Sequence, residues 1–285
     1  MMFKYQKKTI FILLFLVIPL FVSCNPQRNY RAPYLILYAF DAEGALLSQK
    51  MVTDTAEKIL GRDVFIGEIS GKPVILAESG VGMTNAALTA QKLLDLYKPK
   101  GVFFTGIAGA VDTSVSIGDI VICNRWLTHD YGYYGAKGFY PEPINIKKNK
   151  SDSSFQISYF KVDSIFLRKA EGLVETPLSF EKILDRLPEI IVNGVGVSGN
   201  SFIDCLEKRT WLSEHFQALV VDMETAAVAQ VCTINDIPFI AFRSASDLAG
   251  GSGSSTATAE LDNFFKVAAA NSSRLLMKFI EELPD

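Results

Sequence analysis

The sequence has few of the residues that hold metals, form redox pairs or contact nucleic-acid backbones. Its 285 residues include two histidines and four cysteines, and no two cysteines are spaced as in a Cys-x-x-Cys pair. This spacing is typical of zinc and redox sites, so we expect neither a metal nor a cofactor. Lysine and arginine total 28 against 31 acidic residues, which leaves no basic excess to neutralise nucleic-acid phosphates. The composition favours a small-molecule partner and no nucleic acid.

The N-terminus has the pattern of an export signal. Three lysines precede an apolar run from Ile10 to Val22. A bilayer-spanning helix needs roughly 20 apolar residues, and this run is shorter, so a signal peptide is favoured over a transmembrane anchor. Residues 21–24 resemble the lipoprotein box of bacteria, in which a small residue precedes a lipidated cysteine, although Phe21 stands where Leu is usual.

We therefore expect three segments. Residues 1–23 would be a removable lipoprotein-type signal peptide, residues 24–33 a tether with a lipid on Cys24, and residues 34–285 a single domain. This makes the protein a membrane-anchored lipoprotein outside the cytoplasm, in the periplasm or on the cell surface. A cleaved secretory signal without lipid is the alternative interpretation.

The rest of the chain alternates short apolar runs with stretches of helical spacing. Strands are expected at residues 34–38, 64–69, 73–77, 102–104, 218–221 and 239–242, and helices from about residue 44, at 84–97, at 224–235 and at 256–283. This alternation is typical of an α/β fold, and the hairpin formed by residues 64–77 makes the sheet mixed. The predicted fold is a three-layer αβα sandwich around a central mixed β-sheet.

Three acidic residues follow expected strands. Glu43 comes after the first, Glu224 after the strand that ends at residue 221, and Asp247 after the strand that ends at residue 242. Each alone is more often a helix cap or a solvated acid. Ligands of α/β proteins bind at the carboxyl ends of the strands, so the shared placement makes all three candidate site residues.

Five motifs occur in the order found in a known enzyme superfamily. They are ESGVG at 78–82, TGIAG at 105–109, IGDIV at 117–121, VDMETA at 221–226 and RSASD at 243–247. The chain resembles methylthioadenosine/S-adenosylhomocysteine nucleosidases and related purine nucleoside phosphorylases from about residue 34 to residue 284. The resemblance implies the same fold, a homodimer and a purine nucleoside as the substrate.

The resemblance also implies the role of each site residue. Glu43 would activate the attacking water, Glu224 would hold the ribose hydroxyls, and Asp247 would protonate the purine ring. A purine leaves its sugar far better once protonated, which explains the need for an acid beside the base. The implied substrate-binding residues are Gly109, Phe202, Ile203, Met223, Ser246 and Arg243, with Phe202 stacked on the base and Arg243 supporting the site.

The acceptor of the sugar distinguishes a hydrolase from a phosphorylase. Phosphorylases of the superfamily bind phosphate with arginines, but Phe104 stands where they carry an arginine and Ile107 where a serine is expected. Residues 41–47 hold no basic residue either. Placing phosphate beside Glu43 without a cation would bring like charges together. Hydrolysis is favoured, with a phosphorylase or a non-catalytic nucleoside-binding or storage protein as the alternatives.

Two further segments leave their roles open. Residues 129–135 are rich in aromatic residues and glycine, and are a candidate wall for the pocket of the sugar 5′ substituent. His129 within them is either catalytic or structural, and a lone loop histidine is more often structural. Residues 249–255 alternate glycine and serine, which is typical of either a lid over a site or an exposed linker.

Overall fold

The computed structural model describes residues 32–148 and 153–284. The predicted signal peptide, the lipid-carrying Cys24 and all but the last two residues of the tether lie outside the described residues. Within the described ranges, no helix combines the length and the apolar character that a membrane crossing requires.

A large mixed sheet forms the centre of the fold. Along its main path the strands lie in the order β12-β7-β14-β15-β5-β1-β4-β3-β2. Off this path, β16 pairs with β5, β6 with β16, and β13 with β6. Their bounds are β1 Tyr34–Tyr38, β2 Val52–Ile59, β3 Arg62–Ile69, β4 Lys72–Glu78, β5 Gly101–Ala110, β6 Ile120–Ile122, β7 Arg125–Thr128, β12 Phe160–Lys161, β13 Ile190–Val192, β14 Val195–Ser198, β15 Ala218–Asp222 and β16 Phe239–Leu248. β1 pairs in parallel with β4 and β5, and β16 pairs in parallel with β5. The carboxyl ends of these strands therefore meet at one edge.

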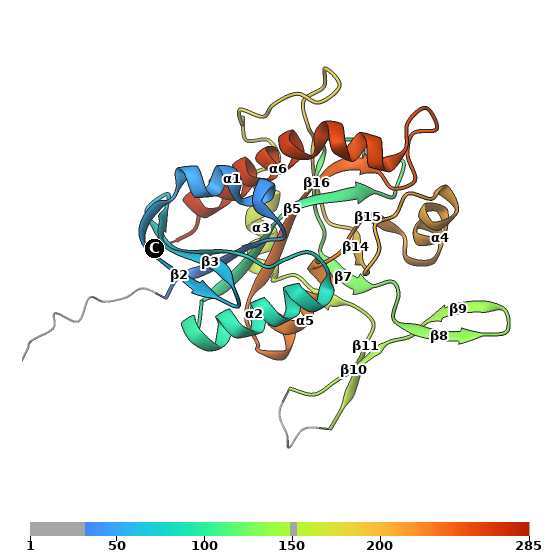
Figure 1. The fold of residues 1–285 in the computed structure, drawn as a ribbon, viewed down its shortest axis with the longest axis horizontal. Coiled ribbons are helices and arrows are strands. Elements are labelled where there is room, and N and C mark those ends of the chain that lie inside the picture. The colour runs from blue at the N-terminus through green and yellow to red at the C-terminus, as the bar shows by residue number, and fades with distance from the viewer. Residues whose placement is uncertain (1–31, 149–152, 285) are drawn as a thin grey trace, which may run out of the picture. The chain divides into compact units, whose positions relative to one another are not determined.

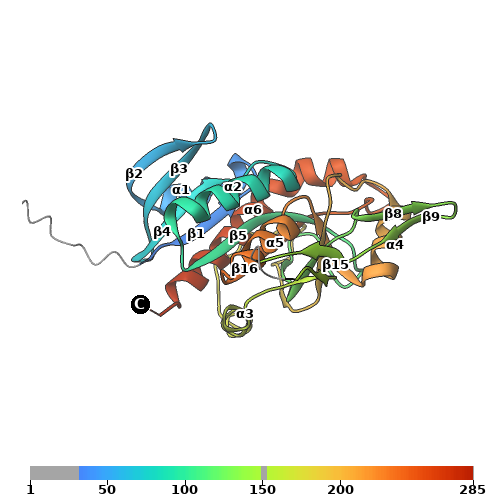
Figure 2. The same cartoon turned by 90° about the horizontal axis from the view of Figure 1, so that it is seen from below.

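Helices cover both faces of the sheet. Figure 1 shows α1 and α6 on one face and α2 and α5 on the other, and Figure 2 shows α2 and α5 side by side. The helices are α1 Asp41–Lys50, α2 Met83–Tyr97, α3 Ser164–Glu171, α4 Leu206–Phe216, α5 Thr225–Ile234 and α6 Ala257–Glu281. This arrangement is the predicted three-layer αβα sandwich around a mixed sheet.

Most of the expected elements are present; most of the strands are longer than predicted, whereas α5 and α6 are slightly shorter. The hairpin of residues 64–77 is confirmed as antiparallel β3 and β4. The strand predicted to end at residue 242 continues to Leu248, and the helix predicted from about residue 44 begins at Asp41. β2, which pairs with the free side of β3, was not predicted. Its residues are almost all exposed, so they carry no buried face for a pattern to reveal.

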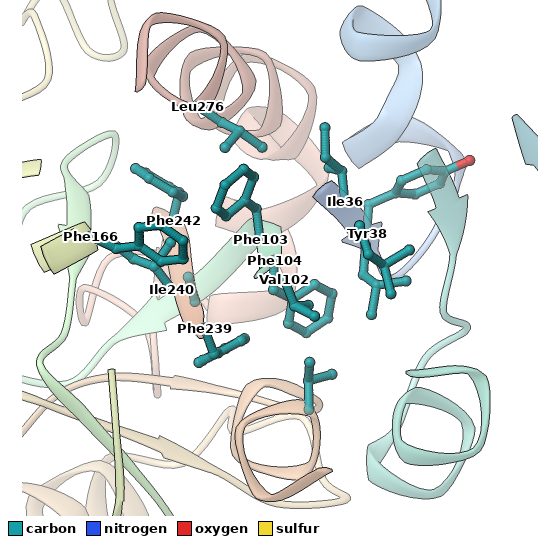
Figure 3. Packing of buried hydrophobic residues seen from close by; sticks show 14 of the residues in the cluster. Ile36, Tyr38, Val102, Phe103, Phe104, Phe166, Phe239, Ile240, Phe242 and Leu276 are labelled. Atoms are coloured by element: carbon teal, nitrogen blue, oxygen red, sulfur yellow. The ribbon is translucent and has the colours of Figure 1, made fainter. Parts of the chain in front are cut away.

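The core lies where the central strands meet α6 and α3. Figure 3 shows aromatic and aliphatic side chains of β1, β5 and β16 packed together, with Phe103 directed toward Leu276 of α6. The Phe103 ring lies 5.4 Å from the rings of both Phe166 and Phe279, edge to face. Such packing fixes the sheet to α6, and α6 also contributes to the site described below.

Two small hairpins lie outside the main sheet. They pair β8 Gly132–Gly135 with β9 Gly138–Pro141, and β10 Ile144–Ile146 with β11 Phe155–Ile157. Figure 1 shows the β8–β9 hairpin extending away from the sheet, and Tyr133 and Tyr134 on it are 59% and 78% exposed. The aromatic segment noted in the sequence is therefore a projecting ribbon.

Candidate active site

A cavity of about 310 Å³ opens at the carboxyl ends of the central strands. Strands β1, β5, β15 and β16 lead into it, and the first turns of α1 and α6 complete its wall. It is lined by Ala39, Phe40, Glu43, Val81, Ile107, Ala108, Gly109, Ser201, Phe202, Ile203, Val221, Asp222, Met223, Glu224, Ser246, Asp247, Ala249, Leu261, Asp262 and Phe265. The three acids selected from the sequence thus share one cavity.

Glu43 lies in the first turn of α1 and is 1% exposed. Its Oε1 accepts a hydrogen bond of 2.8 Å from the backbone N–H of Ile107, and its Oε2 accepts one of 2.5 Å from that of Ala39. Burial raises the pKa of Glu43, against the opposing charge of Arg243. Two fixed donors and a fully buried carboxyl hold this group in one orientation at the cavity wall.

Glu224 occupies the N-cap position of α5. Its Oε1 accepts a hydrogen bond of 2.8 Å from the N–H of Gly82, at the start of α2. The carboxyl is 5% exposed, and burial together with the charge of Asp222 raises its pKa to about 8. The acid therefore joins the beginnings of two helices, where backbone N–H groups favour an acceptor.

Asp247 lies inside β16, not beyond its end as the sequence suggested. The strand carries a bulge between Ala245 and Asp247, with Ser246 as the extra residue, and this sets Asp247 opposite Gly109 of β5. A Cβ atom at Gly109 would stand 2.9 Å from Oδ1 of Asp247. The missing side chain of this glycine leaves the room that the carboxyl occupies.

The two oxygens of Asp247 differ. Oδ2 accepts a hydrogen bond of 2.8 Å from the hydroxyl of Ser246, whereas the buried Oδ1 has no partner among the described residues. Burial raises the pKa of Asp247 to about 7. A buried acid that holds its proton near neutral pH and has one free oxygen beside a cavity is suited to donating that proton.

Arg243, grouped with the substrate-binding residues but expected to support the site, lies outside the cavity lining. It is fully buried, and it lies among the carboxylates of Glu43, Asp222 and Glu224 at 3.5, 2.9 and 3.7 Å. Its guanidinium also lies over the Phe104 ring, 4.1 Å from the ring centre. Neighbouring acids attract the cation away from the cavity surface, so it supports the site from behind.

The remaining predicted substrate-binding residues all line the cavity, namely Gly109, Phe202, Ile203, Met223 and Ser246. Phe202 is 43% exposed at its mouth, and Ile203 beside it is buried. The loop that carries them is held by Asn200, whose Oδ1 accepts a hydrogen bond of 3.0 Å from the N–H of Met83. An exposed aromatic ring at a cavity mouth offers a flat face on which a base can stack.

His129 and the β8–β9 hairpin lie outside the cavity lining. His129 is 2% exposed, and neither ring nitrogen has a hydrogen-bond partner among residues 32–148 and 153–284. Burial lowers its pKa, so the neutral ring is favoured. Within this chain the position of His129 fits the structural interpretation, and the hairpin forms no wall of the cavity.

The glycine- and serine-rich loop is fastened at both ends. Glu260 of α6 accepts hydrogen bonds from the N–H groups of Leu248 and Ser252, at 2.8 and 3.0 Å. Asp204 accepts bonds from the N–H groups of Ala257 and Thr258, where α6 begins. Ala249, at the start of the loop, lines the cavity.

Comparisons with known proteins agree with this geometry. The model of the family described as the phosphorylase superfamily matches residues 33–281. The chain belongs to the phosphorylase superfamily. It is 31% identical over 255 residues to the 5'-methylthioadenosine/S-adenosylhomocysteine nucleosidase of Staphylococcus epidermidis, which covers 87% of this chain and 99% of that protein. At this level of identity it is a nucleosidase-like member of the superfamily.

Solved structures of a nucleosidase and of a futalosine hydrolase share the fold. The nucleosidase of Neisseria meningitidis in complex with methylthio-immucillin-A is similar at a TM-score of 0.73 and 26% identity, over 89% of this chain and 100% of that one. Futalosine hydrolase of Helicobacter pylori has a TM-score of 0.71 at 23% identity, over 88% of this chain and 99% of that one.

Several residues that line the cavity were not predicted from the sequence. Leu261 and Phe265 reach the cavity from α6, and Phe40 and Val81 from loops. The helical spacing of Leu261 and Phe265 gave a signal, but it indicates a buried face and does not say whether a core or a ligand covers it. Asp222 stood in the VDMETA motif and was not singled out.

Charge in the cavity has one sign. Among the described residues, its lining includes five acids and neither lysine nor arginine. No cluster of potential metal ligands occurs in the described ranges either. Arg243 forms ion pairs with three of these acids, Glu43, Asp222 and Glu224, so its charge is already shared among three carboxylates.

Proposed function

We propose that this protein hydrolyses the N-glycosidic bond of purine nucleosides, with 5'-methylthioadenosine or S-adenosylhomocysteine as the substrate. The Staphylococcus epidermidis relative, named for both nucleosides, supports this choice. The observation that carries it is Asp247, a buried acid with a pKa of about 7 and a free Oδ1 beside the cavity. A purine needs a proton to leave, and this group holds one at neutral pH.

The reaction divides the work among three carboxyls. Asp247 gives its proton to the purine ring while the bond from the sugar to the base breaks and its electron pair leaves with the base. Positive charge then spreads over the sugar ring, where the carboxylates of Glu43 and Glu224 stabilise it. Glu43 takes a proton from water as the water oxygen bonds to the sugar carbon. Glu224 accepts hydrogen bonds from the ribose hydroxyls.

Water is the acceptor that this cavity favours. A phosphate ion beside Glu43 would lie among acids, without a cation in the described lining to hold it. Like charges in a partly desolvated site repel by several kcal/mol, on the order of the whole binding free energy of a weak ligand. A phosphorylase is therefore the second candidate.

Release of free base from candidate nucleosides tests this function. The full chain, purified in detergent, is incubated with 5'-methylthioadenosine, S-adenosylhomocysteine, adenosine, inosine and futalosine, with and without phosphate. We expect release without phosphate for the first two, and none from Asp247→Asn. Release that requires phosphate would identify a phosphorylase. No release from any nucleoside would favour the binding or storage role.

The place of action and the assembly are part of the same proposal. We propose that a lipid on Cys24 holds the protein outside the cytoplasm, where it would release bases for uptake. We also propose a homodimer, the assembly implied by the resemblance noted in the sequence. Sedimentation of the detergent-solubilised chain tests it, and a monomer at micromolar concentration would contradict it.

A further inference from the structure

Behind the cavity, four charged groups share one buried space. Arg243 is 0% exposed, and the side chains of Glu43, Asp222 and Glu224 around it are 1%, 2% and 6% exposed. They come from four elements, namely β16, α1, β15 and the start of α5. Three acids thus compete for one cation. Burial disfavours the charged form of any carboxyl that does not pair with this cation.

Asp222 holds the best contact with the cation. Its Oδ2 lies 2.9 Å from Nε of Arg243, and the same Nε donates a hydrogen bond of 2.9 Å to the hydroxyl of Thr225. Nη1 reaches Glu43 at 3.5 Å, and Nη2 stands 3.7 Å from Glu224 without any hydrogen-bond partner among the described residues. The guanidinium therefore lies between the two catalytic carboxyls without a close ion pair to either.

Asp222 is itself firmly placed. Its Oδ1 accepts hydrogen bonds from the hydroxyl of Ser198 at 2.5 Å, and from the N–H groups of Glu224 and Thr225 at 3.2 and 3.1 Å. Its Oδ2 also accepts a bond from the Thr225 hydroxyl. Donors from β14 and from the beginning of α5 thus stabilise the charged carboxylate and fix the position of the guanidinium.

We propose that Asp222 is a positioning residue, which draws Arg243 away from Glu43 and Glu224 and so controls which of these two carboxyls is ionised. The proposal rests on the hydrolysis proposed above, in which Glu43 must accept a proton. A guanidinium free to pair with Glu43 or Glu224 would hold that carboxylate in its charged form and make it a weaker base.

The remaining surroundings agree with this role. The groups that act on Glu224 are the charges of Asp222, Arg243 and Glu43 and the N–H of Gly82, and the charge of Asp222 raises the pKa of both Glu224 and Glu43. Asp247 has different charged neighbours, which are Glu260, Asp204 and Arg209. A change at Asp222 should therefore act on the two glutamates and leave Asp247 as it is.

The pH profile of kcat/KM for Asp222→Asn tests the proposal. Asparagine keeps an acceptor oxygen but removes the charge, so Arg243 can pair more fully with the glutamates. We expect the acidic limb, which reports ionisation of the base, to move down by at least about 1 pH unit. The basic limb, which reports loss of the Asp247 proton, should stay in place.

Asp119→Asn is the matched control. Asp119 is also 1% exposed and also pairs with an arginine, Arg186, but it lies outside the cavity lining. Its loss should lower stability and leave both limbs unmoved. An Asp222→Asn profile with unmoved limbs, or with both limbs moved together, would overturn the proposal.

A second variant covers the case in which Asp222→Asn does not fold. Thr225→Val removes the hydroxyl shared by Asp222 and Arg243 and changes no charge. An acidic limb moved downward supports the proposal, and an unmoved one overturns it. Failure of the proposed hydrolysis is a separate result, since the unaltered protein would then release no base from any nucleoside.

Discussion

Asp247→Asn should abolish base release and, at alkaline pH, stabilise the folded protein. The carboxyl is 1% exposed, and burial raises its pKa from 3.8 to about 7. Below pH 4 the folded and unfolded chains both hold the proton, so the group has no effect on stability there. Between about pH 4 and pH 7 only the unfolded chain releases it, and stability falls as the pH rises.

The size of the effect follows from the same pKa. A difference of about three between the two states corresponds to ~4 kcal/mol of free energy of unfolding, at about 1.4 kcal/mol per pH unit. The full loss is present above pH 7. Asparagine does not ionise and avoids it, although the altered hydrogen bond from Ser246 costs ~1 kcal/mol. We expect the variant to be about 3 kcal/mol more stable at pH 8, and within about 1 kcal/mol of the unaltered protein at pH 4.

Urea unfolding at pH 4, 6 and 8, followed by the fluorescence of the buried Trp126, measures this difference. Asp262→Asn is the control, because this acid lines the same cavity but is exposed to water. Its stability should follow the unaltered protein at every pH. A stability gain from Asp247→Asn that is the same at pH 4 and pH 8, or a loss at pH 8, would refute the assignment of a buried proton to Asp247.

Three further predictions concern the cavity mouth and the N-terminus. Asn200→Ala should raise KM several-fold with a smaller change in kcat, since it frees the N–H of Met83, and Asn200→Asp, which keeps the acceptor, should restore KM. Phe202→Ala should raise KM by about twofold to tenfold, the equivalent of the ~0.5–1.5 kcal/mol of one aromatic contact; an unchanged KM would exclude stacking. Cys24→Ser should abolish incorporation of labelled fatty acid and move the protein from the membrane to the soluble fraction, and continued labelling would show that another residue carries the lipid.

The central strands were predictable because burial gave them a simple pattern. Residues 34–38 are apolar and buried throughout, and so are residues 102–104. β16 was cut short at residue 242 because Arg243, Ser244 and Asp247 are polar, although they are as buried as the residues before them. Their polar atoms find partners such as the carbonyl of Gly118 and the buried carboxylates, which no local pattern reveals.

The site was partly predictable for a similar reason. The placement of acidic residues after apolar runs marked Glu43, Glu224 and Asp247, and motif resemblance added the role of each. The sequence did not reveal that Arg243 lies behind these acids, because its position results from three carboxylates on separate elements. Asp222 was missed because it ends β15 only two residues before Glu224, and only the folded chain shows which of the two contacts the cation more closely.

The direction of β1 bears on how an anchored protein would meet its substrate. The carbonyl of Pro33, just before the strand, accepts a hydrogen bond from the N–H of Lys100 at one edge of the sheet. At the other end of this central strand, Ala39, Phe40 and Glu43 border the cavity. A pulling force transmitted through Pro33 would therefore act at the end of β1 that lies away from the cavity. With the proposed lipid on Cys24, attachment through this end of β1 would leave the cavity side of the domain open to nucleosides.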